Sequence, residues 1–512
     1  MAGPDPEKEI EGAYVVPKGW IWCTVEEVFF EIMNGTTEAQ NVDGFGFPVT
    51  RIETIQKGEF DMFRVKFIDS CSQEFLDKYK YRVGDIALSH INSKEHVGKT
   101  AIYLGHPETL IHGMNLLRLR FGHTNGFPQF FYWYFQSEKF RNDVRGRVKH
   151  AVNQVSINQK NLSQIILPLP PPPEQHRIVT KLEALLAQVN RSKDHLAKVP
   201  PLIKRFRQSV LAAACSGRLT EDWRREHPDV EPARKIIEAI SQRRLKQANT
   251  STKKQKIKDI YSHREGQDSD LLPQSWEYVA IDKLCESFQY GTSKKSMPVG
   301  KIPVLRMGNI QNGEIDWNDL VYTSDVGEIE KYRLEPETVL FNRTNSPELV
   351  GKTAIYRGEN PAIFAGYLIR INNYKELDSE YLNYCLNTTY TKERCLKVKT
   401  DGVSQSNINA QKLGKFEITF CPLEEQQEIV RRVDVLFKNI GSIEDHYKKA
   451  NAQVDNLTQS ILARALRGEL VPQDPNDEPA SVLLERIKQA RAELKAKKKT
   501  QKRKSKTLLD FN

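Results

Sequence analysis

The feature that most constrains this chain is an internal repeat that runs through nearly all of its 512 residues. The peptide "VGKTAIYLG" at 97–105 returns as "VGKTAIYRG" at 350–358, and "VTRIETIQKGEFD" at 49–61 aligns with "VLRMGNIQNGEID" at 304–316. "EQHRIV" likewise returns as "EQQEIV", and "SVLAAACSGRL" as "SILARALRGEL". The offset stays at about 250 residues, far longer than a solenoid repeat, so each copy is expected to be domain-sized.

The first part of each half has the pattern of a mixed α/β domain. Short β-type runs are separated by Gly, Pro and Asn, and a compact apolar helical signal follows at Phe127–Ser137 and at Ser379–Thr388. The aromatic run Phe130–Phe135 has two interpretations, base stacking or packing in a core, and the helical pattern favours the core.

The second part of each half has the heptad pattern of long amphipathic helices. The two apolar seams are Ile178, Leu182, Leu185 and Val189 in the first copy, and Ile429, Val433, Leu436, Ile440 and Ile443 in the second. A continuous helix from Glu174 to Val199 would span about 39 Å. We expect the two seams to pair with each other, antiparallel. The alternative is that each seam packs only onto its own α/β domain.

Prolines and glycines mark the predicted ends of these helices. Pro200 and Pro201 are expected to break the first helix, because proline is tolerated only in a first turn. A second amphipathic segment then begins in each copy. Gly217 and Gly468 follow these second segments and fit the position just beyond a helix C-terminus.

A phosphate-binding loop is the tempting interpretation of Gly98-Lys99-Thr100. The Walker pattern requires a glycine five residues before the second one, and Ser93 and Ser346 occupy those positions in the two copies. The peptide also continues as a short strand that ends in a turn, whereas a phosphate-binding loop opens a helix. A polar turn leading into a buried strand is therefore favoured.

Composition and motifs favour a binding protein over an enzyme. The net charge of +10 and pI of about 9.0 are compatible with a nucleic-acid partner. We find no adenine methyltransferase motif, no carboxylate cluster with nuclease spacing and no zinc pattern among the seven cysteines. We also find no signal peptide and no apolar run of the ~18–20 residues that span a bilayer. We therefore expect a cytoplasmic, non-catalytic protein with no metal site and no cofactor of its own.

Two similar domains on a stiff helical spacer suit the reading of two DNA half-sites, whose major-groove faces lie about 34–36 Å apart when one helical turn separates them. The copies differ most in loops rich in side chains that can read base edges. The predicted DNA-binding residues are Arg51, Ser89, Asn92, Lys94, Arg147, Lys149 and Gln154 in the first half, and Arg306, Arg343, Asn345, Lys397, Lys399 and Gln405 in the second.

Several stretches resemble the specificity subunit of type I restriction-modification enzymes. They are the openings "PKGW" and "LPQSW", the segments "PPPPEQHRIVTKLEALLAQV" and "LIKRFRQSVLAAACSGRLTEDW", and their counterparts "EEQQEIVRRVDVLF" and "NLTQSILARALRGELVPQD". The resemblance covers nearly the whole chain, and the helical segments are its most specific part.

The resemblance implies a fold and a set of partners. The fold would be two similar mixed α/β target recognition domains separated by a long antiparallel helical coiled coil, an internal duplication with pseudo-two-fold symmetry. Each domain would read one half of an asymmetric, bipartite target in double-stranded DNA. Two modification subunits, which use S-adenosylmethionine to methylate adenine N6, would dock on Glu174–Leu196 and Glu425–Tyr447. Two restriction subunits would use ATP and Mg. The whole would act in the prokaryotic cytoplasm.

On these grounds the chain divides into six predicted segments. They are a first target recognition domain (1–155), a central conserved helical region with a spacer helix (156–248), a linker (249–270), a second target recognition domain (271–405), a distal helical region with a spacer helix (406–490) and a basic, disordered tail (491–512). A nucleotide-binding protein with a phosphate loop and a coiled-coil scaffold without a DNA role remain the alternatives.

Overall fold

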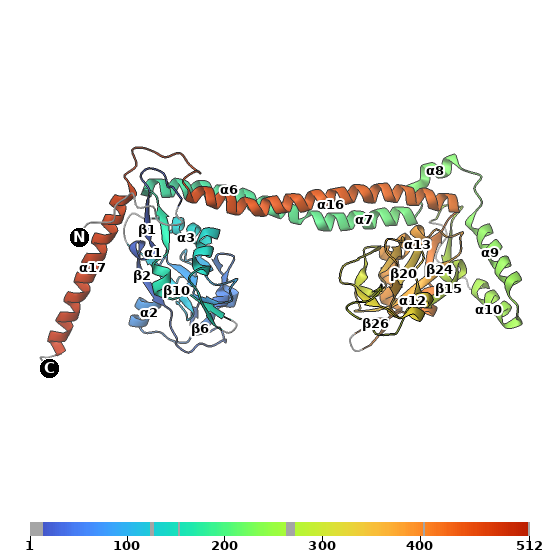
Figure 1. Ribbon diagram of the computed structural model, residues 1–512, viewed down its shortest axis with the longest axis horizontal. Coiled ribbons are helices and arrows are strands. Elements are labelled where there is room, and N and C mark those ends of the chain that lie inside the picture. The colour runs from blue at the N-terminus through green and yellow to red at the C-terminus, as the bar shows by residue number, and fades with distance from the viewer. Residues whose placement is uncertain (1–13, 123–126, 152–153, 263–271, 403–404, 510–512) are drawn as a thin grey trace. The chain divides into compact units, whose positions relative to one another are not determined.

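The computed structural model describes residues 14–122, 127–151, 154–262, 272–402 and 405–509, and these divide into two compact units (Figure 1). Unit 1 comprises residues 1–197 and 449–512, and unit 2 comprises 198–448. Each unit contains one α/β domain together with helices from both repeats, so the predicted duplication and mixed α/β class are confirmed.

The first α/β domain, between Ile21 and Leu169, is built on an antiparallel four-stranded sheet in the order β2-β10-β7-β9. A three-stranded sheet, β11-β12-β8, extends from the end of β7, and β1 pairs with β13. The strands are β1 (Ile21–Thr24), β2 (Phe29–Asn34), β7 (Ile86–Ser89), β8 (Ile91–Asn92), β9 (Thr100–Ile102), β10 (Leu116–Phe121), β11 (Lys149–Ala151), β12 (Gln154–Ser156) and β13 (Ile166–Leu169).

The second α/β domain, between Glu277 and Phe420, repeats this topology. Its four-stranded sheet has the order β15-β24-β20-β22, its three-stranded sheet is β21-β26-β25, and β14 pairs with β27. The strands are β14 (Glu277–Ala280), β15 (Cys285–Tyr290), β20 (Thr338–Asn342), β21 (Thr344–Asn345), β22 (Thr353–Tyr356), β24 (Leu368–Asn373), β25 (Thr400–Asp401), β26 (Ser406–Asn407) and β27 (Glu417–Phe420).

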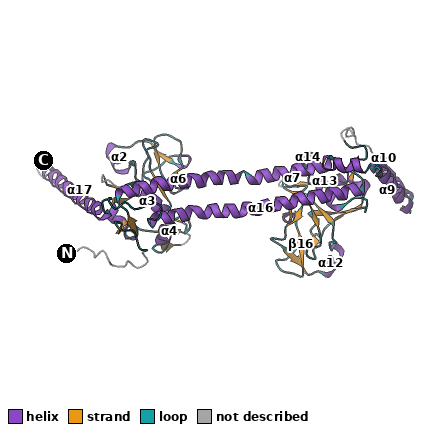
Figure 2. Cartoon of the chain, turned by 90° about the horizontal axis from the view of Figure 1, so that it is seen from above, coloured by secondary structure: helices purple, strands orange, loops and turns teal. Residues whose placement is uncertain are grey.

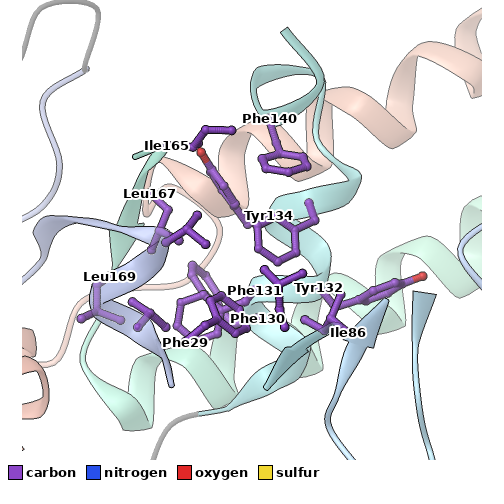
Figure 3. Packing of buried hydrophobic residues seen from close by; sticks show 14 of the residues in the cluster. Phe29, Ile86, Phe130, Phe131, Tyr132, Tyr134, Phe140, Ile165, Leu167 and Leu169 are labelled. Atoms are coloured by element: carbon purple, nitrogen blue, oxygen red, sulfur yellow. The ribbon is translucent and has the colours of Figure 1, made fainter. Parts of the chain in front are cut away.

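The predicted aromatic helix lies in the core of unit 1. Helix α3 (Pro128–Gln136) buries Phe130, Phe131 and Tyr134 against the sheet, with Phe29 from β2 packed among their rings (Figure 3). Side chains that are fully covered in this way are not available to stack on bases, so the core interpretation of this run is correct. Its counterpart α13 (Ser379–Leu386) is buried equally in unit 2.

In unit 1, helix α6 (Pro172–Ala197) runs antiparallel to the last part of helix α16 (Leu423–Leu466), as Figure 2 shows. Lys193 near the end of α6 pairs with Asp455 at 2.8 Å, whereas Glu174 near its start accepts a hydrogen bond from Gln473, which follows α16, at 2.9 Å. Ile178 and Leu182 share one apolar cluster with Leu462, Ala465 and Leu466.

In unit 2, helix α7 (Val199–Cys215) packs in the same antiparallel manner on the first part of α16. Arg207 pairs with Glu444 at 3.3 Å, and Val210, Leu211 and Ala214 lie in one cluster with Ile429 and Val433. A single residue, Lys198, separates the end of α6 from the start of α7, and α7 carries the proline pair in its first turn, as expected.

The predicted pairing of the two seams with each other is wrong. The seam of α6 (Ile178, Leu182) and the seam at the start of α16 (Ile429, Val433) belong to separate apolar clusters in separate units. Each seam is instead covered by its own α/β domain and by the second amphipathic segment of the other repeat. Leu185 and Leu436 are only partly buried, and Ile443 is 51% exposed.

A further helix from each repeat docks on the α/β domain of the other. Helix α9 (Ala233–Gln247) begins where the Ala233 amide donates to the Ser275 carbonyl at 2.9 Å, beside the second domain. Helix α17 (Ala480–Leu509) begins in the same way beside the first domain, where the Ala480 amide donates to the Gly19 carbonyl at 2.9 Å.

Two segments expected to lack structure are helical. Helix α10 (Ser251–Ser262) lies within the predicted linker, and the Tyr261 hydroxyl near its end donates to the Lys283 carbonyl at 2.7 Å. Helix α17 continues to Leu509 and so includes most of the predicted tail. Runs of Lys, Ala and Gln are strong helix formers, and their charge alone is a poor guide to disorder.

A buried glutamate ties each α/β domain to its long helix. Glu174 in α6 accepts a hydrogen bond from the Trp20 indole at 2.9 Å, and Glu425 in α16 accepts one from the Trp276 indole at 2.8 Å. The neighbouring residue Gln426 bonds the Asp378 amide at 2.8 Å. The repeated tryptophan and Glu-Gln motifs therefore hold the domains in a fixed orientation on their helices.

Candidate nucleic-acid interface

The candidate interface is the edge of each α/β domain where the four-stranded sheet meets the three-stranded sheet. In the second domain, β20 ends at Asn342 and the chain continues through Arg343 into β21, which pairs antiparallel with β26. Figure 1 shows β26 at the margin of the domain. We call this edge the recognition platform of the second domain: residues 343–345, 399–401 and 405–407, with Tyr290 and Tyr367.

Arg343 is the best-positioned side chain on this platform. Its guanidinium lies over the ring of Tyr290, 4.7 Å from the centroid, and donates to Asn407 Oδ1 at 3.2 Å. Its backbone amide donates to the Tyr367 carbonyl at 2.9 Å. Tyr290 is 40% and Tyr367 46% exposed, so two aromatic faces and a restrained arginine lie together at the surface. Exposed rings and guanidinium groups in this combination are typical of nucleic-acid binding surfaces.

Ion pairs also shape this platform. Lys399 contacts the Asp401 carboxylate, and this contact, together with the Ser406 hydroxyl, holds the pKa of Asp401 below its usual range. Asn407 is fixed in turn because its amide donates to Thr344 Oγ1 at 2.9 Å. Several polar groups of the platform are therefore oriented before any ligand arrives.

The first domain presents the equivalent platform with different side chains. The Ile157 amide donates to the His90 carbonyl at 2.9 Å, just as the Ile408 amide donates to the Arg343 carbonyl at 2.8 Å. His90 therefore takes the place of Arg343. In the same strand registers, Asn34, Asn115 and Ser156 replace Tyr290, Tyr367 and Asn407. Partial burial lowers the pKa of His90, which favours its neutral form.

The structure places seven of the predicted DNA-binding residues on or beside the two platforms. Asn92 lies in β8, Lys149 in β11 and Gln154 in β12, and these three strands form one sheet. Arg343, Asn345, Lys399 and Gln405 surround the matching sheet of the second domain.

The remaining predicted residues fall into other positions. Lys94, Arg147 and Lys397 lie at exposed or half-exposed turns and helix ends. Arg51 and Arg306 occupy equivalent positions before short 3₁₀ helices, where they pair with Glu53 at 2.6 Å and Asp319 at 3.2 Å.

Ser89 has no exposed surface, so it cannot meet a base directly in this structure. Its hydroxyl accepts a hydrogen bond from Asn92 at 3.2 Å. Ser89 therefore orients Asn92 and does not itself belong to the exposed surface of the platform.

The sequence did not single out Tyr290, Tyr367, His90 and Asn115 as DNA-binding residues. Tyr290 is the last residue of β15, whereas Tyr367, His90 and Asn115 lie just outside strand ends, and within each domain these residues come together only through the order of the sheet. One signal was present, because "NGTT" at Asn34 aligns with "YGTS" at Tyr290 and differs at the first residue.

The phosphate-loop interpretation is also settled by the fold. The repeated Gly-Lys-Thr peptide leads into β9 in the first domain and into β22 in the second, so a strand follows where a phosphate-binding loop requires a helix. Among the described residues, no group of three or more His, Cys, Asp or Glu side chains is arranged to hold a metal ion. Every described helix is also too short or too polar to cross a bilayer.

The same α/β scaffold occurs twice, each time attached to a long helix and each time with a different polar platform. This arrangement defines a recognition protein with an internal duplication. The chain belongs to the type I restriction modification DNA specificity domain family, whose model matches residues 17–199 and 273–452.

Relatives match along most of their length. The chain is 27% identical over 513 residues to the EcoKI specificity subunit of Escherichia coli strain K12. The match covers 95% of this chain and 99% of that relative. It is 28% identical to the putative MjaX specificity subunit of Methanocaldococcus jannaschii, with coverage of 89% and 94%.

Two solved structures share the fold. The first comes from work on complex assembly and conformational transition of the type I R-M system. It superposes with a TM-score of 0.64 at 18% identity, and the match covers 89% of this chain and 100% of that chain. The HsdS subunit from Thermoanaerobacter tengcongensis gives 0.52 at 18% identity, with coverage of 90% and 99%.

Proposed function

We propose that this specificity subunit reads an asymmetric, bipartite DNA target, with one half-site for each α/β domain. One observation carries the proposal: the two platforms occupy the same place on the same scaffold but present different side chains. Tyr290, Arg343 and Tyr367 stand where Asn34, His90 and Asn115 stand in the first domain. Two identical DNA-binding surfaces would suit a palindromic target, whereas two different surfaces suit a target with two unrelated half-sites.

The helices would set the number of unread base pairs between the half-sites. Support comes from α16, a single helix of 44 residues whose beginning belongs to unit 2 and whose end belongs to unit 1. The glutamate–tryptophan contacts described above would transmit this constraint to the platforms.

The chemistry would reside in partner subunits. By resemblance, two modification subunits would bind S-adenosylmethionine, methylate adenine N6 and dock on Glu174–Leu196 and Glu425–Tyr447. Two restriction subunits would consume ATP with Mg. Methylation requires the adenine to leave the base stack, which a partner subunit would accomplish. This chain would then contribute recognition and assembly without catalysis.

Exchange of one α/β domain tests the proposal. Replacing residues 17–155 with the corresponding segment of another family member is expected to change one half of the methylated motif and to leave the other half and the gap unaltered. Methylome sequencing of a host strain carrying the modification subunit with either chain provides the measurement.

The reciprocal exchange of residues 271–405 is the control and should change only the other half. A change in both halves after a single exchange would contradict the proposal. If the complex shows no preference among DNA sequences, a helical scaffold without a DNA role becomes the better account.

A further inference from the structure

A group of three lysines in unit 2 lies where helix α7 meets helix α14 (Thr389–Val398). The two helices touch at Gln208, whose side chain accepts a hydrogen bond from Thr389 at 3.0 Å and donates to the Asn387 carbonyl at 3.4 Å. Lys204 lies one turn before Gln208 on α7, and Lys392 lies in the first turn of α14. Both side chains are exposed.

The third lysine comes from the repeated Gly-Lys-Thr peptide. Lys352 immediately precedes β22, where the Thr353 carbonyl accepts a hydrogen bond from the Asn387 side chain at 3.1 Å. The Lys352 ammonium donates to Gln311 Oε1 at 3.0 Å. We refer to Lys204, Lys352 and Lys392 as the lysine cluster.

The charge of these three lysines lacks a partner of opposite sign among the residues that the structure describes. In the described part of the chain, none of the three lysines forms an ion pair with a carboxylate. Partial desolvation lowers the pKa of Lys392, although its side chain keeps exposed surface, and the positive charges of Lys204 and Lys352 lower it further. Like charges held this close destabilise one another unless an anion binds between them.

The duplication provides an internal comparison. In unit 1 the equivalent positions are Asp455, Arg141 and Lys99. Asp455 carries the opposite charge to its counterpart Lys204 and pairs with Lys193 at 2.8 Å. In unit 1 the Glu138 amide donates to Gln459 Oε1 at 3.2 Å, so the equivalent helix contact forms there without a lysine at this position, and the cluster is not a requirement of the fold.

Positive charge continues from the cluster to the recognition platform. Helix α14 carries Lys392, Arg394 and Lys397 with one carboxylate, Glu393, and the chain then reaches Lys399, which pairs with Asp401. A row of cations that ends at a base-reading surface matches the arrangement of phosphates along a DNA strand.

We propose that Lys204, Lys352 and Lys392 bind phosphates of the DNA backbone next to the half-site read by the second domain. The inference rests on the proposed function and adds a site outside the variable platforms. Contacts to phosphate carry no sequence information, so this site contributes affinity and salt dependence, and leaves the recognised sequence unchanged.

The test compares the wild-type complex with its modification subunits and a complex carrying Lys204→Gln and Lys392→Gln. Binding to a target duplex and to a scrambled duplex is measured by fluorescence anisotropy over a series of salt concentrations. Because each lost phosphate contact reduces the slope of log K against log salt by about 0.9, we expect the slope to fall by about 1.8 on both duplexes. The ratio of the two affinities should stay the same.

The matched control carries Lys235→Gln and Lys246→Gln on α9, which remove the same charge from exposed positions in the same unit. It should keep the wild-type slope. An unchanged slope in the Lys204/Lys392 variant would overturn the inference, as would loss of the modification subunit from that variant. If the wild-type complex binds both duplexes equally, the proposed function fails. The comparison of slopes still decides whether the lysine cluster binds phosphates.

Discussion

Replacing Glu425 with alanine is expected to destabilise the junction between α16 and the second α/β domain by about 3–5 kcal/mol. The Glu425 carboxylate is fully buried and accepts hydrogen bonds from Trp276 at 2.8 Å and Thr220 at 2.7 Å, and it also pairs with Arg224. Removing it leaves a largely buried guanidinium without its counter-charge, together with two donors that lose their acceptor. Hydrogen exchange of backbone amides in β14 and the first turns of α16 measures this loss locally.

Two variants serve as controls. Glu424 is the exposed neighbour of Glu425, so Glu424→Ala should leave exchange unchanged. The equivalent carboxylate Glu174 faces the Gln473 amide in place of an arginine, so Glu174→Ala should cost less because no charge is left unpaired. Equal acceleration of exchange in units 1 and 2 of the Glu425→Ala protein would contradict a local role.

Replacing Arg343 with alanine is expected to relax sequence selectivity at the half-site of the second domain by about 1–3 kcal/mol, roughly 5- to 150-fold. The guanidinium is positioned by Tyr290 and Asn407 and has donors to spare for a base edge. Arginine most often makes its specific contact with guanine, so a guanine is expected at the affected position. Methylome sequencing should show degeneracy at that position only.

The scaffold should survive this substitution, because Asn407 retains its hydrogen bond to Thr344. His90→Ala in the first domain is the reciprocal variant and should affect only the other half of the motif. Arg333→Ala, which removes an exposed arginine of the second domain outside the platform, controls for the loss of charge. A uniform loss of affinity on all sequences for Arg343→Ala would indicate a phosphate contact and contradict base reading.

The duplication, the aromatic core helix and the long helices could be predicted from sequence because each has a local or periodic signal. Gly217 and Gly468 also adopt the left-handed conformation expected just beyond a helix end, with φ of 77° and 73°. The partners of the helical seams could not be predicted. Heptad spacing shows that Ile178 and Ile429 need apolar partners, but several amphipathic segments of the chain offer one.

Prediction of the recognition site was less complete for a related reason. Asn345 and Gln405 lie in loop-rich, variable stretches that sequence alone identifies. Tyr290 and Tyr367 lie at the ends of regular strands, which look like core from sequence, and they reach Arg343 only through the sheet order β15-β24-β20. Helix α10 and the part of α17 beyond residue 490 were predicted to lack structure because their composition is polar and basic, yet Lys, Ala and Gln favour a helix.

The docking of α9 and α17 has a consequence for how such a chain can be rearranged. The Ala233 amide at the start of α9 bonds the Ser275 carbonyl, and the Ala480 amide at the start of α17 bonds the Gly19 carbonyl. Each unit therefore combines a helix from one repeat with the α/β domain of the other. Neither hydrogen bond involves residues 249–271, so we expect both to persist in a chain that is opened within that range. These contacts therefore do not specify which of the two repeats comes first in the chain.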